Sequence, residues 1–491
     1  MHDRRDWITP TLGGKPWLEK PALYYWQTTL AYSIFGVSDW AARLASAVDA
    51  TVMIVAVYLF LRRFRSGFQL DGALMTATAS GVIGFARAAS MDMPLAAMFT
   101  IALLAWYAWY ESASKYFLML FYVFIGLAML AKGPVAPFLA AVIVLLFAAA
   151  KGDYLLVRRT CWIPGIALFS MVALPWYVAV QLKNPEFFRV FMLQHNLGRF
   201  GKDLFHHTEP FWYYLPVVLI GLMPWTMFVI SALAERIRVW WTEKRAMLRS
   251  DALPAFLVIW LVVPAVFFSF SASKLPGYVL PALPAGTLLL AEYVRQHVAD
   301  KDRPHLLLIA LHAITAALPV VAALMMPYIV FQHTLPRGRA AAIPGGFAVV
   351  LAVGIALTLR GQFGLRVLRF VTLVPVLLAV GAVVRFGAPA LDAELSARPL
   401  SQEINRVDNG SLPLAILRLP RETEYGLQFY RNQNILRYEL GQIPAGEHLV
   451  VAPAGWQKNV AKWTTGRRVT YLGSLAAPGL DYYWVAGKSS N

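Results

Sequence analysis

Long apolar runs, separated by short polar segments, dominate the chain from residue 41 to residue 386. A transmembrane α-helix needs about 20 consecutive, mostly apolar residues to cross the hydrocarbon core of a bilayer. The runs therefore predict a polytopic α-helical membrane protein with about 12 spans. We place these spans at residues 41–61, 72–89, 94–110, 115–131, 134–150, 162–182, 212–234, 252–270, 276–294, 305–331, 343–360 and 366–386.

After residue 388 the apolar runs become short, β-branched and aromatic, with Pro and Gly between them. Runs such as LPLAILRLP, HLVVAP, RRVTYLG and DYYWVAG predict strands, and EYGLQFYRNQ predicts a short helix or turn. We therefore expect a small α/β domain over residues 389–491, following a transmembrane domain over residues 41–388. Residues 1–40 form a loop in this prediction, with an amphipathic helix over about 22–35 that lies in the membrane interface.

The composition supports the membrane assignment and excludes some kinds of functional site. The chain is 58% hydrophobic and only 14% charged, whereas about 25% of the residues in a soluble domain are charged. The single cysteine, Cys161, excludes an internal disulfide and a cysteine-based metal cluster. The net charge of +17 is explained mainly by basic cytoplasmic loops and in part by an anionic ligand, and it does not require nucleic acid.

The basic residues also predict the orientation of the spans. The loops after spans one, five, seven, nine and eleven are rich in Lys and Arg, which places them in the cytoplasm. The segment 183–211 and both ends of the chain then lie outside. Because MHDRRDWITP lacks the apolar core of a signal peptide, we expect a further transmembrane helix upstream and thus 13 spans in the complete protein.

Charged residues at the membrane edge are costly and suggest function, and the first such cluster is WLEKPALYYW. It contains Glu19 and Lys20, and three aromatic residues, Tyr24, Tyr25 and Trp26, follow a few positions later. One interpretation is a solvated loop pair whose lysine reaches into the interface. The other is a lysine that receives a lipid phosphate, with a carboxylate beside it.

Two further clusters, ARAASMDMPLA and LAKGPVAP, lie at predicted outer turns. The first contains Arg87 and Asp92, and Asp92 stands just before a Met-Pro pair, where a helix N-cap is expected. Asp92 is thus either a cap or a functional carboxylate near Arg87. In the second cluster Lys132 precedes Gly133-Pro134, which is also the pattern of a lysine anchoring a turn.

The last two clusters are NPEFFRVFMLQHNLGRF with the following HHTEPFWYY, and SASKLPGYVLP. The former carries His195, Arg199 and further His and Glu residues, so it is either a metal set without tight spacing or ordinary interfacial polarity. The latter carries Lys274 and Tyr278. Taken together, the clusters favour an anionic headgroup with a long apolar tail, because phosphate requires cations and the tail requires a groove between helices.

These segments resemble a known family. DWITPTLGGKPWLEKPALYYW with FGVSDWAARLASA is similar to the first outer loop of the GT-C glycosyltransferases that use polyprenyl-phosphate sugars. ARAASMDMPLA, GLAMLAKGPVAP, QHNLGRF, FWYYLPVVLIGLMPW and SKLPGYVLP match further blocks in the family's order. The resemblance covers residues 6–295 and points to the bacterial protein-mannosyltransferase-like group, which includes the aminoarabinose transferase of lipid A.

The resemblance implies an inverting transfer of a sugar, such as 4-amino-4-deoxy-L-arabinose, from undecaprenyl phosphate to lipid A or another acceptor at the outer face of the inner membrane. It implies that Lys20 binds the donor phosphate and that Glu19 and His195 form the pair for a divalent metal. It assigns Asp92 and Glu19 as catalytic carboxylates. It further implies that Tyr278 and Arg199 line the donor site, and the charged outer turns add Arg87 and Lys274 as candidate substrate-binding residues. No organic cofactor and no nucleic acid are expected.

One family feature is not found in these residues. Family members carry an acidic motif with the first catalytic aspartate after an additional first helix, and Asp3 and Asp6 are poor substitutes for it. An inactive, lipid-binding relative is therefore an alternative. A flippase or transporter of lipid-linked sugars is another, although transporters place charges near the bilayer midplane and contain internal repeats, neither of which the sequence indicates.

Overall fold

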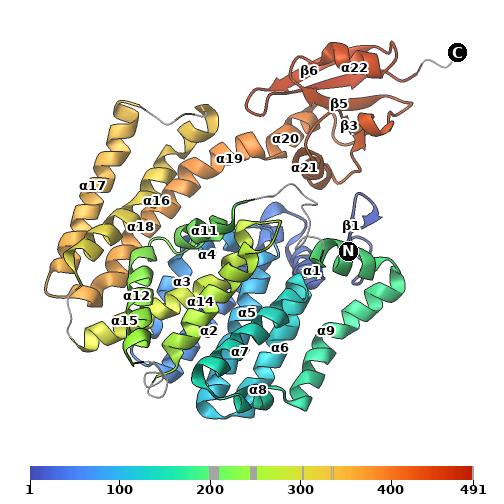
Figure 1. The fold of residues 1–491 in the computed structure, drawn as a ribbon. Coiled ribbons are helices and arrows are strands. Elements are labelled where there is room, and N and C mark those ends of the chain that lie inside the picture. Colours follow the sequence, from blue (N-terminus) through green and yellow to red (C-terminus); the bar gives the residue numbers. More distant parts are fainter. Residues whose placement is uncertain (198–208, 244–250, 301–303, 333, 335–336, 489–491) are drawn as a thin grey trace. The chain divides into compact units, whose positions relative to one another are not determined.

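The computed structural model describes residues 1–197, 209–243, 251–300, 304–332, 334 and 337–488. The chain divides into two compact units (Figure 1). The first comprises residues 1–11, 16–318 and 349–376, and the second comprises residues 12–15, 319–348 and 377–491. Three long helices each contribute residues to both units: α16 (Leu306–Gln332), α17 (Arg339–Arg360) and α18 (Leu368–Ala382). The domain boundaries at residues 40 and 388 stay predictions.

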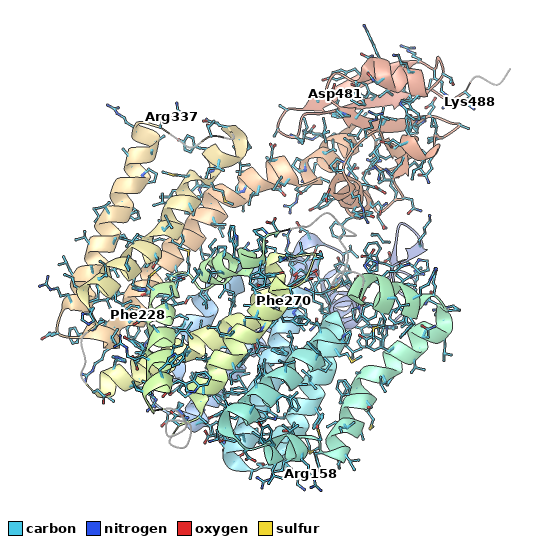
Figure 2. The ribbon with its side chains drawn as sticks, in the orientation of Figure 1. Arg158, Phe228, Phe270, Arg337, Asp481 and Lys488 are labelled. Atoms are coloured by element: carbon cyan, nitrogen blue, oxygen red, sulfur yellow. The ribbon has the colours of Figure 1, made fainter. Side chains whose placement is uncertain are left out.

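The first unit is helical, and its packed side chains are drawn in Figure 2. Its α-helices are α1 (Leu23–Phe35), α2 (Asp39–Phe64), α3 (Gln69–Thr78), α4 (Ser80–Ala86), α5 (Asp92–Ser112), α6 (Lys115–Lys132), α7 (Val135–Lys151), α8 (Leu155–Thr160), α9 (Ile163–Lys183), α11 (Tyr214–Gly221), α12 (Thr226–Glu243), α14 (Leu253–Ser269) and α15 (Leu283–Ala299). A π-helix, η1 (Arg189–Leu197), and two 3-10 helices, η2 (Phe211–Tyr213) and η3 (Pro276–Ala282), lie between them.

The prediction of a polytopic helical membrane protein is confirmed, but not every predicted span is a single long helix. Among the described residues, eight helices are long and apolar enough to cross a membrane, and the bent pair α11 and α12 makes a ninth if it counts as one span. Helices α7 and α14 are apolar but shorter. The span predicted at 72–89 is broken, because Ala79 is extended and the amide of Ser80 donates to the carbonyl of Met223 (2.8 Å).

Helix α5 is buried on all sides, as a helix that is apolar all round should be. Its indole Trp106 stacks on Phe256, with ring centroids 5.4 Å apart, and packs edge-on against Phe147 at 5.7 Å. Trp106 Nε1 also donates to Thr160 Oγ1 (3.0 Å). This packing holds α5 rigidly, so that the residue at its first turn, Asp92, has a fixed position in the unit.

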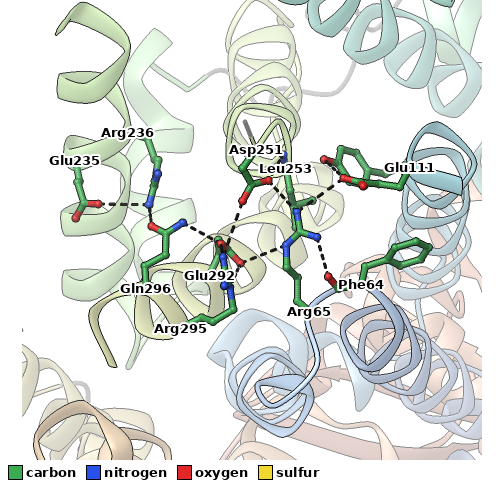
Figure 3. A network of polar contacts seen from close by, with 11 residues as sticks. Phe64, Arg65, Glu111, Glu235, Arg236, Asp251, Leu253, Glu292, Arg295 and Gln296 are labelled. Atoms are coloured by element: carbon green, nitrogen blue, oxygen red, sulfur yellow. Dashed lines mark hydrogen bonds and ion pairs between the residues drawn. The ribbon is translucent and has the colours of Figure 1, made fainter. Parts of the chain in front are cut away.

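An ionic network closes the end of the bundle where α5 finishes (Figure 3). Arg65 Nη2 lies 2.8 Å from Asp251 Oδ1 and 3.8 Å from Glu111 Oε1, and its Nε lies 3.7 Å from Glu292 Oε2. The buried carboxylate of Glu292 also accepts from Arg295 Nε at 2.9 Å. One guanidinium thus joins helices α2, α5 and α15 to the residue ahead of α14, in a region where an unpaired charge would be costly.

The second unit contains a five-stranded mixed sheet with strand order β4-β3-β5-β7-β6. Strand β3 is parallel to both β4 and β5, whereas β7 is antiparallel to β5 and to β6. The strands are β3 (Leu414–Ile416), β4 (Leu436–Arg437), β5 (His448–Pro453), β6 (Val469–Leu475) and β7 (Leu480–Val485). The accompanying helices are α19 (Ala388–Leu395), α20 (Arg398–Val407), α21 (Arg421–Arg431) and α22 (Gln457–Trp463).

All four strands predicted from the sequence occur as β3, β5, β6 and β7, and the predicted short helix is α21. Strand β4 was not predicted, since two residues are too few to show an alternating pattern. A two-stranded hairpin, β1 (Thr11–Leu12) and β2 (Lys15–Pro16), also occurs near the start of the chain. The helix predicted over 22–35 is α1.

We expect Arg65→Met to lower the thermal stability of the protein in detergent. The change removes charge-assisted hydrogen bonds of a kind worth about 1.5–3 kcal/mol and leaves Asp251 and Glu111 without their shared cation. Arg62→Met is the matched control, because Arg62 is exposed on the same helix. Equal melting temperatures for the two variants would contradict a stabilising role for the network.

Candidate functional site

The polypeptide ahead of the Glu19–Lys20 pair is fixed by polar contacts. Asp6 accepts hydrogen bonds from the amides of Ile8 (3.0 Å) and Thr9 (3.2 Å), and Lys183 Nζ donates to its other oxygen (2.9 Å). Burial alone would raise the pKa of Asp6, but these donors lower it to about 2. The carboxylate is therefore ionised at neutral pH, and it ties this segment to the end of α9.

Glu19 and His195, predicted as a pair, are close together in the structure. Glu19 Oε2 lies 3.6 Å from His195 Nδ1, and both side chains are mostly buried. His195 is part of the π-helix η1. Burial, followed by the nearby charge of Glu19, raises the pKa of the Tyr25 phenol on α1. Lys20 is half-buried next to Glu19.

The Glu19–His195 pair has the donor types and the spacing of a metal site. Two ligands that are each ~2.1 Å from a tetrahedral ion lie roughly 3.4 Å apart, close to the 3.6 Å observed between the two side chains. Within the described residues no group of three or more His, Cys, Asp or Glu side chains gathers around an ion position. A divalent ion held by Glu19 and His195 would thus need ligands from elsewhere, such as water or a phosphate, and the metal stays a prediction.

Asp92 forms an ion pair with Lys132. Helices α5 and α6 are antiparallel neighbours, so the first residue of α5 meets the last residue of α6. Lys132 Nζ also lies over the ring of Tyr278, 4.4 Å from its centroid. The three side chains form a compact group at the Asp92 end of the bundle, in which a carboxylate, an ammonium and a phenol are each largely buried.

The structure places Asp92 outside the N-cap position, while its catalytic role stays a prediction. The residue is the first of helix α5, and the residue before it makes no capping hydrogen bond. The amide of Asp92 itself is satisfied by Ser90 Oγ (3.3 Å). The Asp92 carboxylate is directed to Lys132 rather than to the helix terminus, so helix capping does not account for it.

Gly277 packs directly against the Asp92 carboxylate. A Cβ at this position would lie 2.5–2.8 Å from the carboxyl atoms of Asp92, closer than atoms tolerate. Sequence reasoning missed Gly277 as a site residue, and it left Lys132 outside the site because a turn anchor explained it equally well. The available signals were the PGY block, which contains Gly277 and Tyr278, and the position of Lys132 at the end of a long apolar run.

The remaining predicted residues differ in what surrounds them. Arg87 is exposed at the end of α4, and none of the described carboxylates forms an ion pair with it. Lys274 is buried and donates to the carbonyls of Glu209 (3.0 Å) and Ser271 (2.7 Å), which gives it a clear structural role in its loop. Arg199 lies outside the described residues. The substrate contacts predicted for all three stay predictions.

Chemically, this end of the first unit offers cations, ionised carboxylates and an aromatic wall. Lys20 and Arg87 can meet the oxygens of a phosphate, since charge-assisted contacts from Lys and Arg are the strong ones. The Asp92 carboxylate is held by Lys132 and confined by Gly277, so its oxygens have a defined direction. A fixed carboxylate of this kind can orient an acceptor or take a proton from it.

Comparison with known proteins shows what the chain is similar to. Residues 19–178 match the family described as dolichyl-phosphate-mannose-protein mannosyltransferase. The undecaprenyl phosphate-alpha-4-amino-4-deoxy-L-arabinose arabinosyl transferase of Pseudomonas aeruginosa (strain UCBPP-PA14) is 29% identical over 302 residues, which are 60% of this chain and 53% of that protein. The enzyme of the same name from Edwardsiella ictaluri is 29% identical over 305 residues, or 61% of this chain and 53% of its own length. The chain spans about half the length of the curated relatives it matches.

Two solved structures share the fold over almost the whole chain. The crystal structure of ArnT from Cupriavidus metallidurans bound to undecaprenyl phosphate superposes with a TM-score of 0.78 at 21% identity, covering 99% of this chain and 91% of that one. The apo structure of the same protein gives a TM-score of 0.74 at 20% identity, with the same coverage. The chain therefore has the GT-C fold of a multi-pass membrane protein, and the resemblance of its sequence to the protein-mannosyltransferase-like glycosyltransferases is confirmed.

Proposed function

We propose that the protein transfers an aminosugar, 4-amino-4-deoxy-L-arabinose, from undecaprenyl phosphate to lipid A. The curated relatives bear the name of this arabinosyl transfer. The observation that carries the proposal for this chain is the group formed by Asp92, Lys132 and Tyr278 beside Gly277. It supplies a fixed carboxylate and a cation within the first unit, which also carries the Glu19–Lys20 pair.

The transfer that we propose is a displacement with inversion at the anomeric carbon. An acceptor oxygen forms the new bond to this carbon while the bond to the phosphate oxygen breaks, and undecaprenyl phosphate leaves as an anion. Cations such as Lys20 and Arg87 lower the barrier if they stabilise the charge that grows on the leaving phosphate. A divalent ion held by Glu19 and His195 would add positive charge at the same place.

The role of Asp92 depends on the acceptor group. A hydroxyl acceptor loses a proton during the transfer, and a carboxylate can take it. A phosphate of lipid A is already ionised at neutral pH and needs little base catalysis. In that case Asp92, together with its partner Lys132, orients the acceptor.

We place the protein in the bacterial inner membrane, with the site on the periplasmic side. The distribution of basic residues favours the cytoplasm for the loop after helix α2, where Arg62, Arg63 and Arg65 lie. Asp92 belongs to the opposite end of the spans, because Glu111 at the end of α5 lies 3.8 Å from Arg65 just after α2, so α5 runs parallel to α2 and its first residue, Asp92, is at the far end. Transfer on the periplasmic side suits an acceptor such as lipid A.

We expect Lys20→Ala to weaken the binding of undecaprenyl phosphate about tenfold to a hundredfold, because a charged contact of this kind contributes about 1.5–3 kcal/mol. Lys20 lies in a loop, so no core cavity forms and the melting temperature should stay unchanged. Binding is measured with the purified protein in detergent. Lys15→Ala, at an exposed lysine of the preceding hairpin, is the control. A Lys20→Ala protein that binds as tightly as the control would remove Lys20 from the site.

We expect Asp92→Asn to reduce sugar transfer about a hundredfold or more while expression and membrane insertion stay normal, which corresponds to a few kcal/mol of transition-state stabilisation. Asparagine keeps the shape of the side chain but loses the charge that faces Lys132. The assay uses the complete protein, lipid A and undecaprenyl-phosphate aminosugar. Near wild-type turnover would show that the carboxylate has no part in the reaction.

Gly277→Ala should also abolish most of the transfer, without changing any charge. The new methyl group must displace the Asp92 carboxylate, which lies within 2.8 Å of it. Gly84→Ala is the matched control, since a Cβ at Gly84 in helix α4 meets no atom within 4 Å. Both variants are measured in the same transfer assay, and equal activity of the two would argue against a fixed position for Asp92.

A further inference from the structure

The sheet of the second unit contains a topological switch point between β3 and β5. These neighbouring strands are parallel, and the connections that leave them go to opposite faces of the sheet. Helix α21, which follows β3, packs with α20 on the face formed by Leu414, Ile416 and Val451. Helix α22, which follows β5, packs on the other face against Val450 and Ala452. In open α/β sheets, ligands bind outside the carboxyl ends of strands at such a point.

The two loops at this point present a cation and an aromatic ring to each other. Arg418 follows β3 and Trp456 follows β5, and the Arg418 guanidinium carbon lies 5.9 Å from the centroid of the Trp456 ring. Arg418 is exposed, and none of the described carboxylates forms an ion pair with its guanidinium. The helices that follow these two loops each carry a further exposed basic residue near their start. Arg421 is the first residue of α21, and Lys458 is the second residue of α22.

Hydrogen bonds to the backbone hold both loops in place. The amide of Gly455 donates to Asp481 Oδ2 (2.8 Å), a carboxylate labelled in Figure 2, and the amide of Ala454 donates to the Gly479 carbonyl (2.8 Å). On the other loop, Arg437 Nη2 donates to the carbonyl of Leu419 (3.2 Å). The arginine and the tryptophan therefore stand on a fixed frame, as binding residues require.

The backbone of Arg418 is strained. A residue that is only exposed to solvent has no need of such strain. Its φ is +51°, a left-handed conformation that is costly for a side chain with a Cβ. The amide of Arg418 donates to the carboxylate of Glu439, and Arg437 Nη1 pairs with Glu424 (3.1 Å). The carboxylates of Glu439 and Glu424 are thus engaged by these groups, while the Arg418 guanidinium faces the tryptophan ring and is exposed to solvent.

We propose that this switch point binds a phosphate-bearing saccharide, with the phosphate at Arg418 and the sugar ring against Trp456. A guanidinium matches the oxygens of a phosphate, and the flat face of an indole suits the apolar face of a pyranose ring. The choice of a saccharide rests on the proposed function, in which the acceptor is a phosphorylated glycolipid. The site then serves to capture the acceptor headgroup.

The test uses the full-length chain in detergent, with N-acetylglucosamine 1-phosphate as the probe and N-acetylglucosamine and inorganic phosphate as comparison ligands. We expect saturable binding of the sugar phosphate that is tighter than that of either comparison ligand. Arg418→Gln should weaken it about tenfold or more, as the loss of one charge-assisted contact does. Trp456→Phe should weaken the sugar phosphate but leave inorganic phosphate unaffected.

Arg468→Gln is the matched control. Arg468 is also an exposed arginine, but it stands just before the start of β6, the edge strand on the other side of the sheet from β4. The proposal is overturned if the Arg418→Gln variant binds the sugar phosphate as tightly as the Arg468→Gln control. It is also overturned if the wild-type chain shows no saturable binding. Tighter binding of the neutral sugar than of the sugar phosphate also overturns it. Binding of undecaprenyl phosphate is measured alongside, since its loss in the wild-type chain would count against the proposed transfer and not against this site.

Discussion

The burial of helix α5 on all sides is the constraint on which the first unit depends. A helix of 21 residues is about 30 Å long, which matches the hydrocarbon core of a bilayer. The middle of the helix carries buried side chains without charge, whereas its two ends carry the acidic residues Asp92 and Glu111. Each acid meets a cation from another helix, Lys132 at one end and Arg65 at the other. The charged residues of α5 are thereby confined to its two ends.

The two ends use their charges differently. At the Arg65 end, several carboxylates share guanidinium groups and hold the helices α2, α5 and α15 together. At the Asp92 end, the Asp92–Lys132 ion pair stands beside a phenol and a glycine, and the Glu19–Lys20 segment of the same unit adds a cation and a second carboxylate. The first arrangement suits stability, because each charge is compensated within the protein. The second brings a buried carboxylate, an ammonium and a phenol together at one point.

In the second unit, the arrangement of the sheet and its helices limits where a ligand can bind. Its sheet is covered by helices on both faces, so its central strands β3 and β5 are almost entirely buried and offer no side chain to a ligand. Binding chemistry can then reside only in the loops at the strand ends. The pairing of Arg418 with Trp456 across two such loops follows from the parallel order of β3 and β5 and from connections that depart to opposite faces.

The sequence by itself determined the elements and the class of protein. Apolar runs specified helices such as α2, α5 and α9, because lipid and a buried interior both select apolar residues over about 20 positions. Alternating β-branched runs specified β3, β5, β6 and β7. Charged residues at the membrane edge pointed to Glu19, Lys20 and Asp92 as site candidates. Motif order further indicated the glycosyltransferase resemblance that the comparisons bear out.

Only the tertiary structure decided which of these residues meet. Asp92 and Lys132 are 40 residues apart in the chain, and the close approach of Gly277 to Asp92 depends on how η3 packs against α5. The break of the second predicted span at Ala79 depends on a hydrogen bond to Met223, which no local pattern shows. Periodicity reports what surrounds a residue on average, apolar or polar. It does not report which partner from a distant helix satisfies a charge, because that depends on the packing of the whole bundle.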